Sequence, residues 1–180
     1  MEFFNARGVA QIQIYTKNGS FSFHNDVNAS TRKSPATISM TIALPQSKHD
    51  VETAQALTLQ PPSQLEPHIT TLLTWLQDFN WPVARIVRDA LLQCGTSIVP
   101  GVQSVLCGDD SIHKYWILTK LLPLTDSSSR EACMPQVLGL IDDPSPHDVE
   151  EDVHSAAKDL VVLHNYSRQQ SATVRYDAKW

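Results

Sequence analysis

Apolar residues recur at helical spacing through the middle of the chain. The clearest run is Val83, Ile86, Val87, Ala90, Leu91 and Cys94, which follows i, i+3, i+4, i+7, i+8 and i+11. This spacing places all six side chains on one face of a helix, so it predicts an amphipathic helix with a buried stripe. Weaker stripes of the same period predict further helices on both sides of it. About seven helices are expected, over residues 47–59, 64–77, 80–95, 97–108, 109–123, 128–141 and 145–163.

A short phrase headed by proline recurs three times. Its copies are 67–73, 100–106 and 135–141, so the prolines are 33 and 35 residues apart. Periods of this size are typical of stacked helix pairs, in which each unit buries the apolar face of its neighbour. We therefore predict an all-α superhelix over residues 40–163, with one leading helix followed by three antiparallel pairs.

The two ends of the chain lack this periodicity. Residues 11–24 alternate apolar and polar side chains around Asn18-Gly19, which predicts a weak β-hairpin. The rest of 1–39 is polar and aperiodic, so we predict a hairpin-bearing or disordered appendage there. Residues 164–180 are also polar and predict a disordered tail.

Charge is unevenly distributed along the chain. Residues 40–163 contain 7 Lys and Arg against 16 Asp and Glu, a net charge of −9. Nucleic acids and anionic membranes are poor partners for such a domain, because both are recognised mainly by Lys and Arg. No apolar run approaches the roughly 18 residues that a membrane span needs. A basic protein or peptide is the partner that this charge favours.

Motifs for cofactors and metals are missing from the sequence. The three cysteines are scattered and have no histidine or second cysteine at zinc-ligand spacing, which favours a reducing compartment over a disulfide framework or a metal site. No glycine-rich phosphate loop or nucleophile elbow occurs. The N-terminus lacks the apolar segment of a secretory signal. We expect a cytoplasmic protein that uses no cofactor and no metal, and we favour a non-enzymatic role over an enzymatic one.

Capping residues are predicted at several helix ends. Asp78 and Asn80 flank a turn and are expected to bind free helix-end amides. Asp109 or its neighbour Asp110 is expected to cap the helix predicted over 109–123. Ser128 begins a capping-box pattern with Glu131.

The helix after Asp110 is expected to bury one apolar stripe. That stripe contains Ile112, Tyr115, Trp116, Thr119 and Leu122. His113 and Lys114 lie off it, so we expect both at the surface. Together with Asp109 and Asp110 they supply groups for acid–base chemistry, but surface and capping roles are the expected ones.

Two tryptophans and two cations form the candidate binding set. Trp81 and Arg85 are expected to line a groove with Lys114 and Trp116 of the next unit, because Trp and Arg are common anchors at interfaces. The first functional hypothesis is a non-enzymatic protein-interaction module. The alternative is an enzyme or small-molecule binder that uses this groove. A third, nucleic-acid binding, requires Arg85, Arg88, Lys114 and Lys120 to converge on one face.

Two resemblances accompany these patterns. Residues 69–78 and 87–95 resemble a HEAT repeat in the proline-headed first helix, the Asp at its end and the Val-Arg-x-Ala-Leu of the second helix. Residues 75–84, together with 44–50 and 109–116, resemble the domain of unknown function 5071 family over about residues 42–163. The sequence departs from the family pattern at Ser111-Ile-His113, where a Trp is expected before Lys114. The resemblance implies a small HEAT-like helical domain and no established activity.

Overall fold

The computed structural model describes residues 42–177. The chain divides into two units, Met1–Ser39 and Met40–Trp180, and the described residues belong to the second. The hairpin predicted at 11–24 and the appendage predicted for 1–39 lie outside the described residues, as do the last three residues of the predicted tail.

The described part of the chain is all-helical, as predicted, and it contains no strand. No helix within residues 42–177 is both long enough and apolar enough to cross a membrane. Three short 3-10 turns and one π-helical segment, Ile117–Leu121, link or extend the α-helices. The α-helices are α1 (Val51–Leu57), α2 (Pro62–Leu65), α3 (Ile69–Thr74), α4 (Ala84–Leu92), α5 (Val99–Leu106), α6 (Ser111–Trp116), α7 (Ser127–Asp142), α8 (Pro146–Glu150) and α9 (Val153–Asp177).

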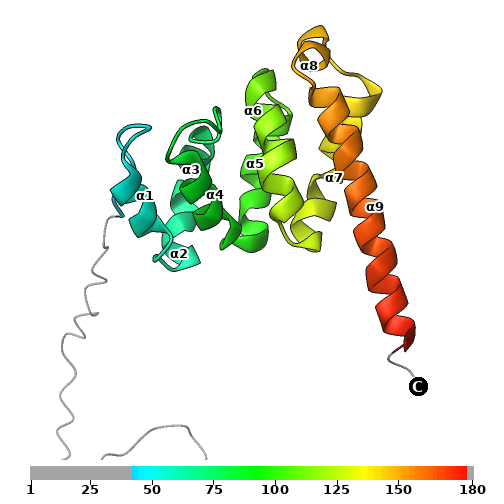
Figure 1. The fold of residues 1–180 in the computed structure, drawn as a ribbon, viewed down its shortest axis with the longest axis horizontal. Coiled ribbons are helices and arrows are strands. Elements are labelled where there is room, and N and C mark those ends of the chain that lie inside the picture. The colour runs from blue at the N-terminus through cyan, green and yellow to red at the C-terminus, as the bar shows by residue number, and fades with distance from the viewer. Residues whose placement is uncertain (1–41, 178–180) are drawn as a thin grey trace, which may run out of the picture. The chain divides into compact units, whose positions relative to one another are not determined.

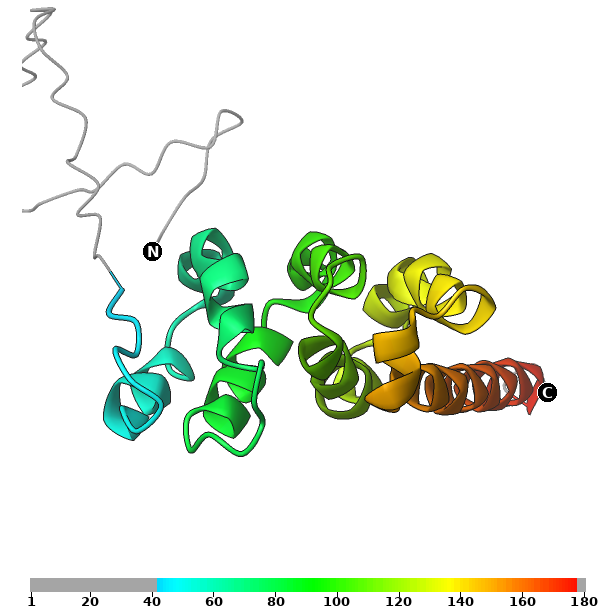
Figure 2. The ribbon, with the colours of Figure 1, turned by 90° about the horizontal axis from the view of Figure 1, so that it is seen from above.

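The helices of the second unit pack in two layers (Figure 2). One layer contains α2 with α3, then α5, then α7. The other contains α1, α4, α6 and α9. Successive helices cross from one layer to the other and run in opposite directions (Figure 1), so each antiparallel pair lies against the next. The leading helix and three pairs that the sequence predicts are therefore present, whereas the curvature of a HEAT superhelix stays a prediction.

The repeated proline phrase accounts for one of these layers. Its copies form α3 with the turn before it, α5, and the second half of α7. The third residue of each copy is Ile69, Val102 or Val137, and all three side chains are buried in one continuous core. Burying an aliphatic side chain of this size stabilises a fold by about 1.5–3 kcal/mol, so equivalent positions hold neighbouring units together.

Gly101 allows α5 to approach α3 closely. A Cβ atom at this position would lie 2.7 Å from Leu73 Cδ1 and 3.2 Å from Ile69 Cγ2. Both distances are shorter than ordinary van der Waals contact, so a side chain here would force Leu73 and Ile69 of the neighbouring unit to shift. This copy of the repeated phrase thus has a small residue where two units meet, whereas the other two copies have His68 and Gln136.

The tail predicted from residue 164 is not reproduced, because α9 continues to Asp177. The prediction used the loss of apolar periodicity, which reports burial rather than helix formation. No proline or glycine follows Pro146, and each residue added to an existing helix gains a hydrogen bond at little cost. His164 is also buried against α7, where its Nε2 lies 3.1 Å from Glu131 Oε2.

Candidate functional site

One edge of the second unit is formed by the segment before α1 and the connections α3–α4, α5–α6 and α7–α8–α9 (Figure 1). We call it the acidic edge, because its connections contain most of the acids of the described residues. Among the exposed or half-exposed acids of this edge, Glu150 alone forms an ion pair within residues 42–177, with 3.3 Å between its Oε2 and His147 Nδ1. The exposed or half-exposed acids of this edge are Asp50, Asp78, Asp109, Asp110, Asp142, Asp143, Glu150, Glu151 and Asp152.

The α3–α4 connection is built from two successive turns. Asp78 Oδ1 accepts a hydrogen bond from the Asn80 amide at 2.9 Å, and the Trp81 and Ala84 amides close the turns onto the carbonyls of Asp78 and Trp81. Asp78 and Asn80 therefore shape the connection. The prediction that they cap the following helix is wrong, because neither caps α4. Helix α4 begins later, after Val83, with no side-chain cap. The second turn separates Asn80 from the free amides of the helix.

Two aromatic groups belong to this connection. Trp75 and Trp81 meet edge to face, with 6.0 Å between ring centroids and 70° between ring planes, and both are half-buried. Phe79 stacks on Trp116 of the following unit at 5.9 Å and 29°. Tyr115 contacts the same Trp116 ring edge to face. Aromatic pairs of this kind add about 0.5–1.5 kcal/mol beyond the area they bury, so they link α3–α4 to α6.

Two cations lie over the Phe79–Trp116 pair. The Arg88 guanidinium is 5.5 Å from the centre of the Phe79 ring, and Lys120 Nζ is 5.7 Å from the centre of the Trp116 ring. Arg88 also forms an ion pair with Asp89, at 2.6 Å. These cations are thus engaged by groups of the chain itself.

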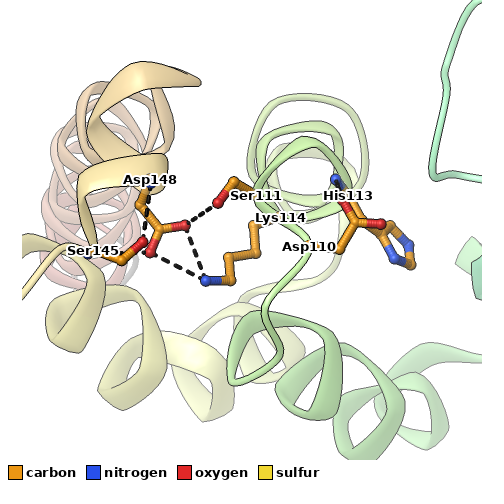
Figure 3. A network of polar contacts seen from close by, with 6 residues as sticks. All are labelled: Asp110, Ser111, His113, Lys114, Ser145 and Asp148. Atoms are coloured by element: carbon orange, nitrogen blue, oxygen red, sulfur yellow. Dashed lines mark hydrogen bonds and ion pairs between the residues drawn. The ribbon is translucent and has the colours of Figure 1, made fainter.

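A buried polar cluster joins α6 to α8 (Figure 3). Lys114 Nζ lies 2.9 and 3.1 Å from the two carboxylate oxygens of Asp148, and the Ser111 hydroxyl donates to Asp148 Oδ1 at 2.7 Å. Asp148 also completes a reciprocal capping box with Ser145 at the start of α8. Ser111, Lys114 and Asp148 are all almost fully buried. The cluster satisfies both buried charges, as the cost of desolvation requires.

The charge of Asp148 is held by its partners. Burial by itself raises the pKa of this carboxyl, but hydrogen bonds from Ser111, Lys114 and Ser145 outweigh it and lower the pKa to about 2. Asp148 is therefore ionised at any pH near neutrality. Its charge serves to fasten α8 against α6.

His113 is buried on the other side of α6, where it contacts α3 (Figure 3). Its Nε2 lies 2.9 Å from the Leu73 carbonyl oxygen. Because a carbonyl can only accept, the proton of the neutral ring is on Nε2. Burial lowers the pKa of His113, against the opposing effects of the Leu73 carbonyl and of Asp110. A neutral His113 therefore links two neighbouring units.

The stripe predicted for α6 is wrong at its start, and so is the surface position predicted for His113 and Lys114. Ile112 is 46% exposed, whereas Ser111, His113 and Lys114 are buried. The inner face begins with polar residues, so hydropathy could not reveal it. A π-helical segment follows Trp116, and Leu122 is buried as predicted.

The predicted groove of Trp81, Arg85, Lys114 and Trp116 is not assembled. Lys114 is committed to Asp148, Trp81 contacts Trp75, and Trp116 contacts Phe79 and Tyr115. Arg85 is exposed. Arg85, Arg88, Lys114 and Lys120 also fail to converge on one face, because Lys114 is buried. The condition set for nucleic-acid binding is therefore not met.

One predicted cap is confirmed in one of its two alternatives, and another is displaced by a neighbouring residue. Asp110, and not Asp109, caps α6 by accepting from the His113 amide at 2.9 Å. Asp126 caps α7 through the Ser129 amide, which leaves Ser128 inside the first turn. In each case the capping carboxylate lies three residues before the free amide that it binds.

The family comparison agrees with the resemblance. A family model described as Domain of unknown function (DUF5071) matches residues 43–161. The chain belongs to this family. No curated protein matches the chain in sequence.

The DUF5071 match spans everything from the segment before α1 to the middle of α9, including the acidic edge and the buried cluster. Sequence reasoning missed Trp75 and Asp148 as members of these sites. The signal for Trp75 was present in the family string 75–84. The signal for Asp148 was the pattern Ser145-Pro-His-Asp148, which spells a capping box but does not reveal the lysine 34 residues earlier.

The three thiols of the described part of the DUF5071 domain lie in different settings. Burial raises the pKa of Cys133 to about 11 and also raises the pKa of Cys94, so both thiols stay protonated. Cys107 is free and exposed. No group of three His, Cys, Asp or Glu residues within 42–177 could hold a metal ion.

Proposed function

We propose that this DUF5071 domain is a non-enzymatic interaction module that binds a basic protein or peptide along its acidic edge. The observation that carries the proposal is the position of the acids. Nine of them lie on the same edge, although they come from four separate parts of the sequence.

Electrostatics supports a basic partner. Charges of one sign along an edge add their fields, attract an oppositely charged chain and accelerate its association. Eight of the nine acids take part in no ion pair within the described residues. Their field is thus available to a partner, in contrast to that of Asp148, which Lys114 neutralises.

The arrangement of the helices supports an elongated binding surface. Stacked helical pairs repeat a connection at regular intervals, so an extended peptide can contact several units at once. In this proposal the domain is a HEAT-like superhelix in the cytoplasm. The three free cysteines are compatible with that reducing compartment.

A charge-matched pair of variants tests the proposal. The edge variant contains Asp109→Asn and Glu151→Gln. The control variant contains Glu66→Gln and Asp159→Asn, two acids that lie outside the acidic edge and form no ion pair within the described residues. Both raise the net charge by the same amount, so only the position of the charges differs.

Binding of a fluorescein-labelled nona-arginine peptide is measured by anisotropy at low and at physiological salt. The edge variant should bind about tenfold more weakly than wild type at low salt, and the control variant should stay within about twofold. The difference should shrink as salt rises. Equal losses in the two variants would show that only net charge matters and would overturn the proposal.

A further inference from the structure

We infer that Trp75, Trp81 and Asp78 form a receptor for one arginine side chain of the basic partner. The inference rests on the proposed function and names the contact that would anchor the partner. We call these three residues the tryptophan corner. All three belong to the α3–α4 connection, on the acidic edge.

The Trp75 and Trp81 rings meet edge to face. Their planes meet at 70° and their centres are 6.0 Å apart. A cation is attracted to an aromatic face within about 6 Å of the ring centre, and tryptophan gives the strongest contact. Both tryptophans are half-exposed, so a guanidinium of the partner can stack within that range on the exposed part of a ring.

Asp78 supplies the matching charge. Its Oδ1 accepts from the Asn80 amide, and Oδ2 has no partner within the described residues. A carboxylate has lone pairs for several donors, so it can hold the turn and a guanidinium at the same time. An arginine suits this arrangement better than a lysine, because its planar guanidinium can stack on an aromatic ring and form an ion pair with a carboxylate at the same time.

The corner differs from the other aromatic pair of the domain. Arg88 lies over the Phe79 ring and Lys120 over the Trp116 ring. Within residues 42–177, these are the cation–π contacts, and neither involves Trp75 or Trp81. The Phe79–Trp116 pair thus forms cation–π contacts with residues of the domain itself. The tryptophan corner contains a carboxylate and, within the described residues, makes no cation–π contact.

Arg85 provides a further test of the inference. It is exposed, lies four residues after Trp81 and was predicted to bind the partner. A basic partner would instead be repelled by it. Replacing Arg85 by Ala should therefore tighten binding of a basic peptide about twofold, whereas a direct contact from Arg85 to the partner would make the same change weaken it.

The test compares Trp81→Leu with Trp116→Leu, two half-buried tryptophans of which only the first belongs to the corner. Each variant is titrated with nona-arginine and with nona-lysine at physiological salt, where the remote charges of the edge are screened. Trp81→Leu should lose about threefold to tenfold in affinity for nona-arginine and less for nona-lysine, and Trp116→Leu should lose less than twofold.

A second substitution covers the case in which Trp81→Leu unfolds. Asp78→Asn keeps an oxygen that can accept from the Asn80 amide and removes only the charge. It should weaken nona-arginine binding more than Asp109→Asn, which removes an edge charge away from the rings. Equal effects of the two carboxylate changes would overturn the inference.

The two proposals fail in different ways. If wild type does not bind nona-arginine, or the edge and control variants bind it equally, the proposed function is wrong. If the edge variant loses affinity while Trp81→Leu binds nona-arginine as tightly as wild type, only the tryptophan corner is wrong.

Discussion

The buried cluster around Asp148 and the connection around Asp78 contain similar residue types in opposite settings. Asp148 is 2% exposed and is surrounded by Lys114, Ser111 and Ser145. Asp78 is half-exposed and binds one backbone amide. The comparison shows that pairing and burial, and not residue type, separate a charge that holds the fold together from one that is available to a partner.

The cost of leaving each charge unpaired should differ accordingly. Removing one member of a buried ion pair leaves the other desolvated and uncompensated, which is far more costly than removing a solvated charge. The Lys114–Asp148 pair joins residues 34 apart in sequence, so its loss would loosen α8 from α6. The following predictions test this contrast, beginning with the largest expected effect.

The substitution Lys114→Met should destabilise the domain by about 3–5 kcal/mol, because it leaves the Asp148 carboxylate buried without its cation. Urea unfolding followed by circular dichroism measures the loss. The double substitution Lys114→Met, Asp148→Asn should recover part of it, since the charge is then absent. A loss below 1 kcal/mol for Lys114→Met would contradict a buried, structural pair.

The substitution Ser111→Ala should destabilise the domain by about 1.5–3 kcal/mol, because a hydrogen bond to a buried carboxylate is lost. The matched control is Ser104→Ala, an exposed serine of α5 that should change stability by less than 0.5 kcal/mol. The two unfolding free energies are compared under the same conditions. Equal values would mean that the Ser111 hydroxyl contributes nothing to the cluster.

Acid should weaken the buried cluster in a defined window. The pKa of Asp148 is about 2 in the folded domain, below the ordinary value of 3.8 for an aspartate side chain. The unfolded chain therefore takes up a proton before the folded one does. The resulting stability is fully present above pH 3.8, amounts to about 2 kcal/mol, and is lost as the pH falls through 2.

Urea unfolding at several pH values between 5 and 2 measures this dependence. Asp148→Asn removes the titrating group but keeps an acceptor for Ser111 and Ser145, so its stability should depend less steeply on pH. Parallel curves for wild type and variant would show that the fold does not rely on the charge of Asp148.

The substitution Asp78→Asn should change stability by less than about 0.5 kcal/mol, since the side chain is half-exposed and Asn can still accept from the Asn80 amide. Thermal unfolding of wild type and variant gives the comparison. A loss as large as that of Lys114→Met would place Asp78 among the residues that hold the fold together and would erase the distinction between the two regions.

Most of the fold could be predicted from sequence because helices have a local period. The stripe of Val83, Val87, Ala90, Leu91 and Cys94 is buried as its spacing required. The repeated proline phrase correctly predicted helices that stack, since Ile69, Val102 and Val137 lie in one core. The buried stripe of α6 was predicted less well, because the inner face of this helix begins with a buried serine and a buried lysine.

The candidate site could be predicted only in part. Trp81, Asp78 and the excess of acids were visible in the sequence, but the partners of Trp81 and Lys114 were not. A lysine next to two aromatics reads the same in sequence whether it points to solvent or to an aspartate 34 residues away. Trp81 likewise pairs with Trp75, although the predicted groove required Trp116.

The sequence by itself determined most of the helical segments, most of the buried aliphatic side chains and the acidity of the domain. Each of these depends on local spacing or on composition. Only the tertiary structure decided which charges are neutralised, which aromatic rings meet and which connections share an edge. The physical reason is that these contacts join residues from separate helices, so they arise from the packing of the units against one another.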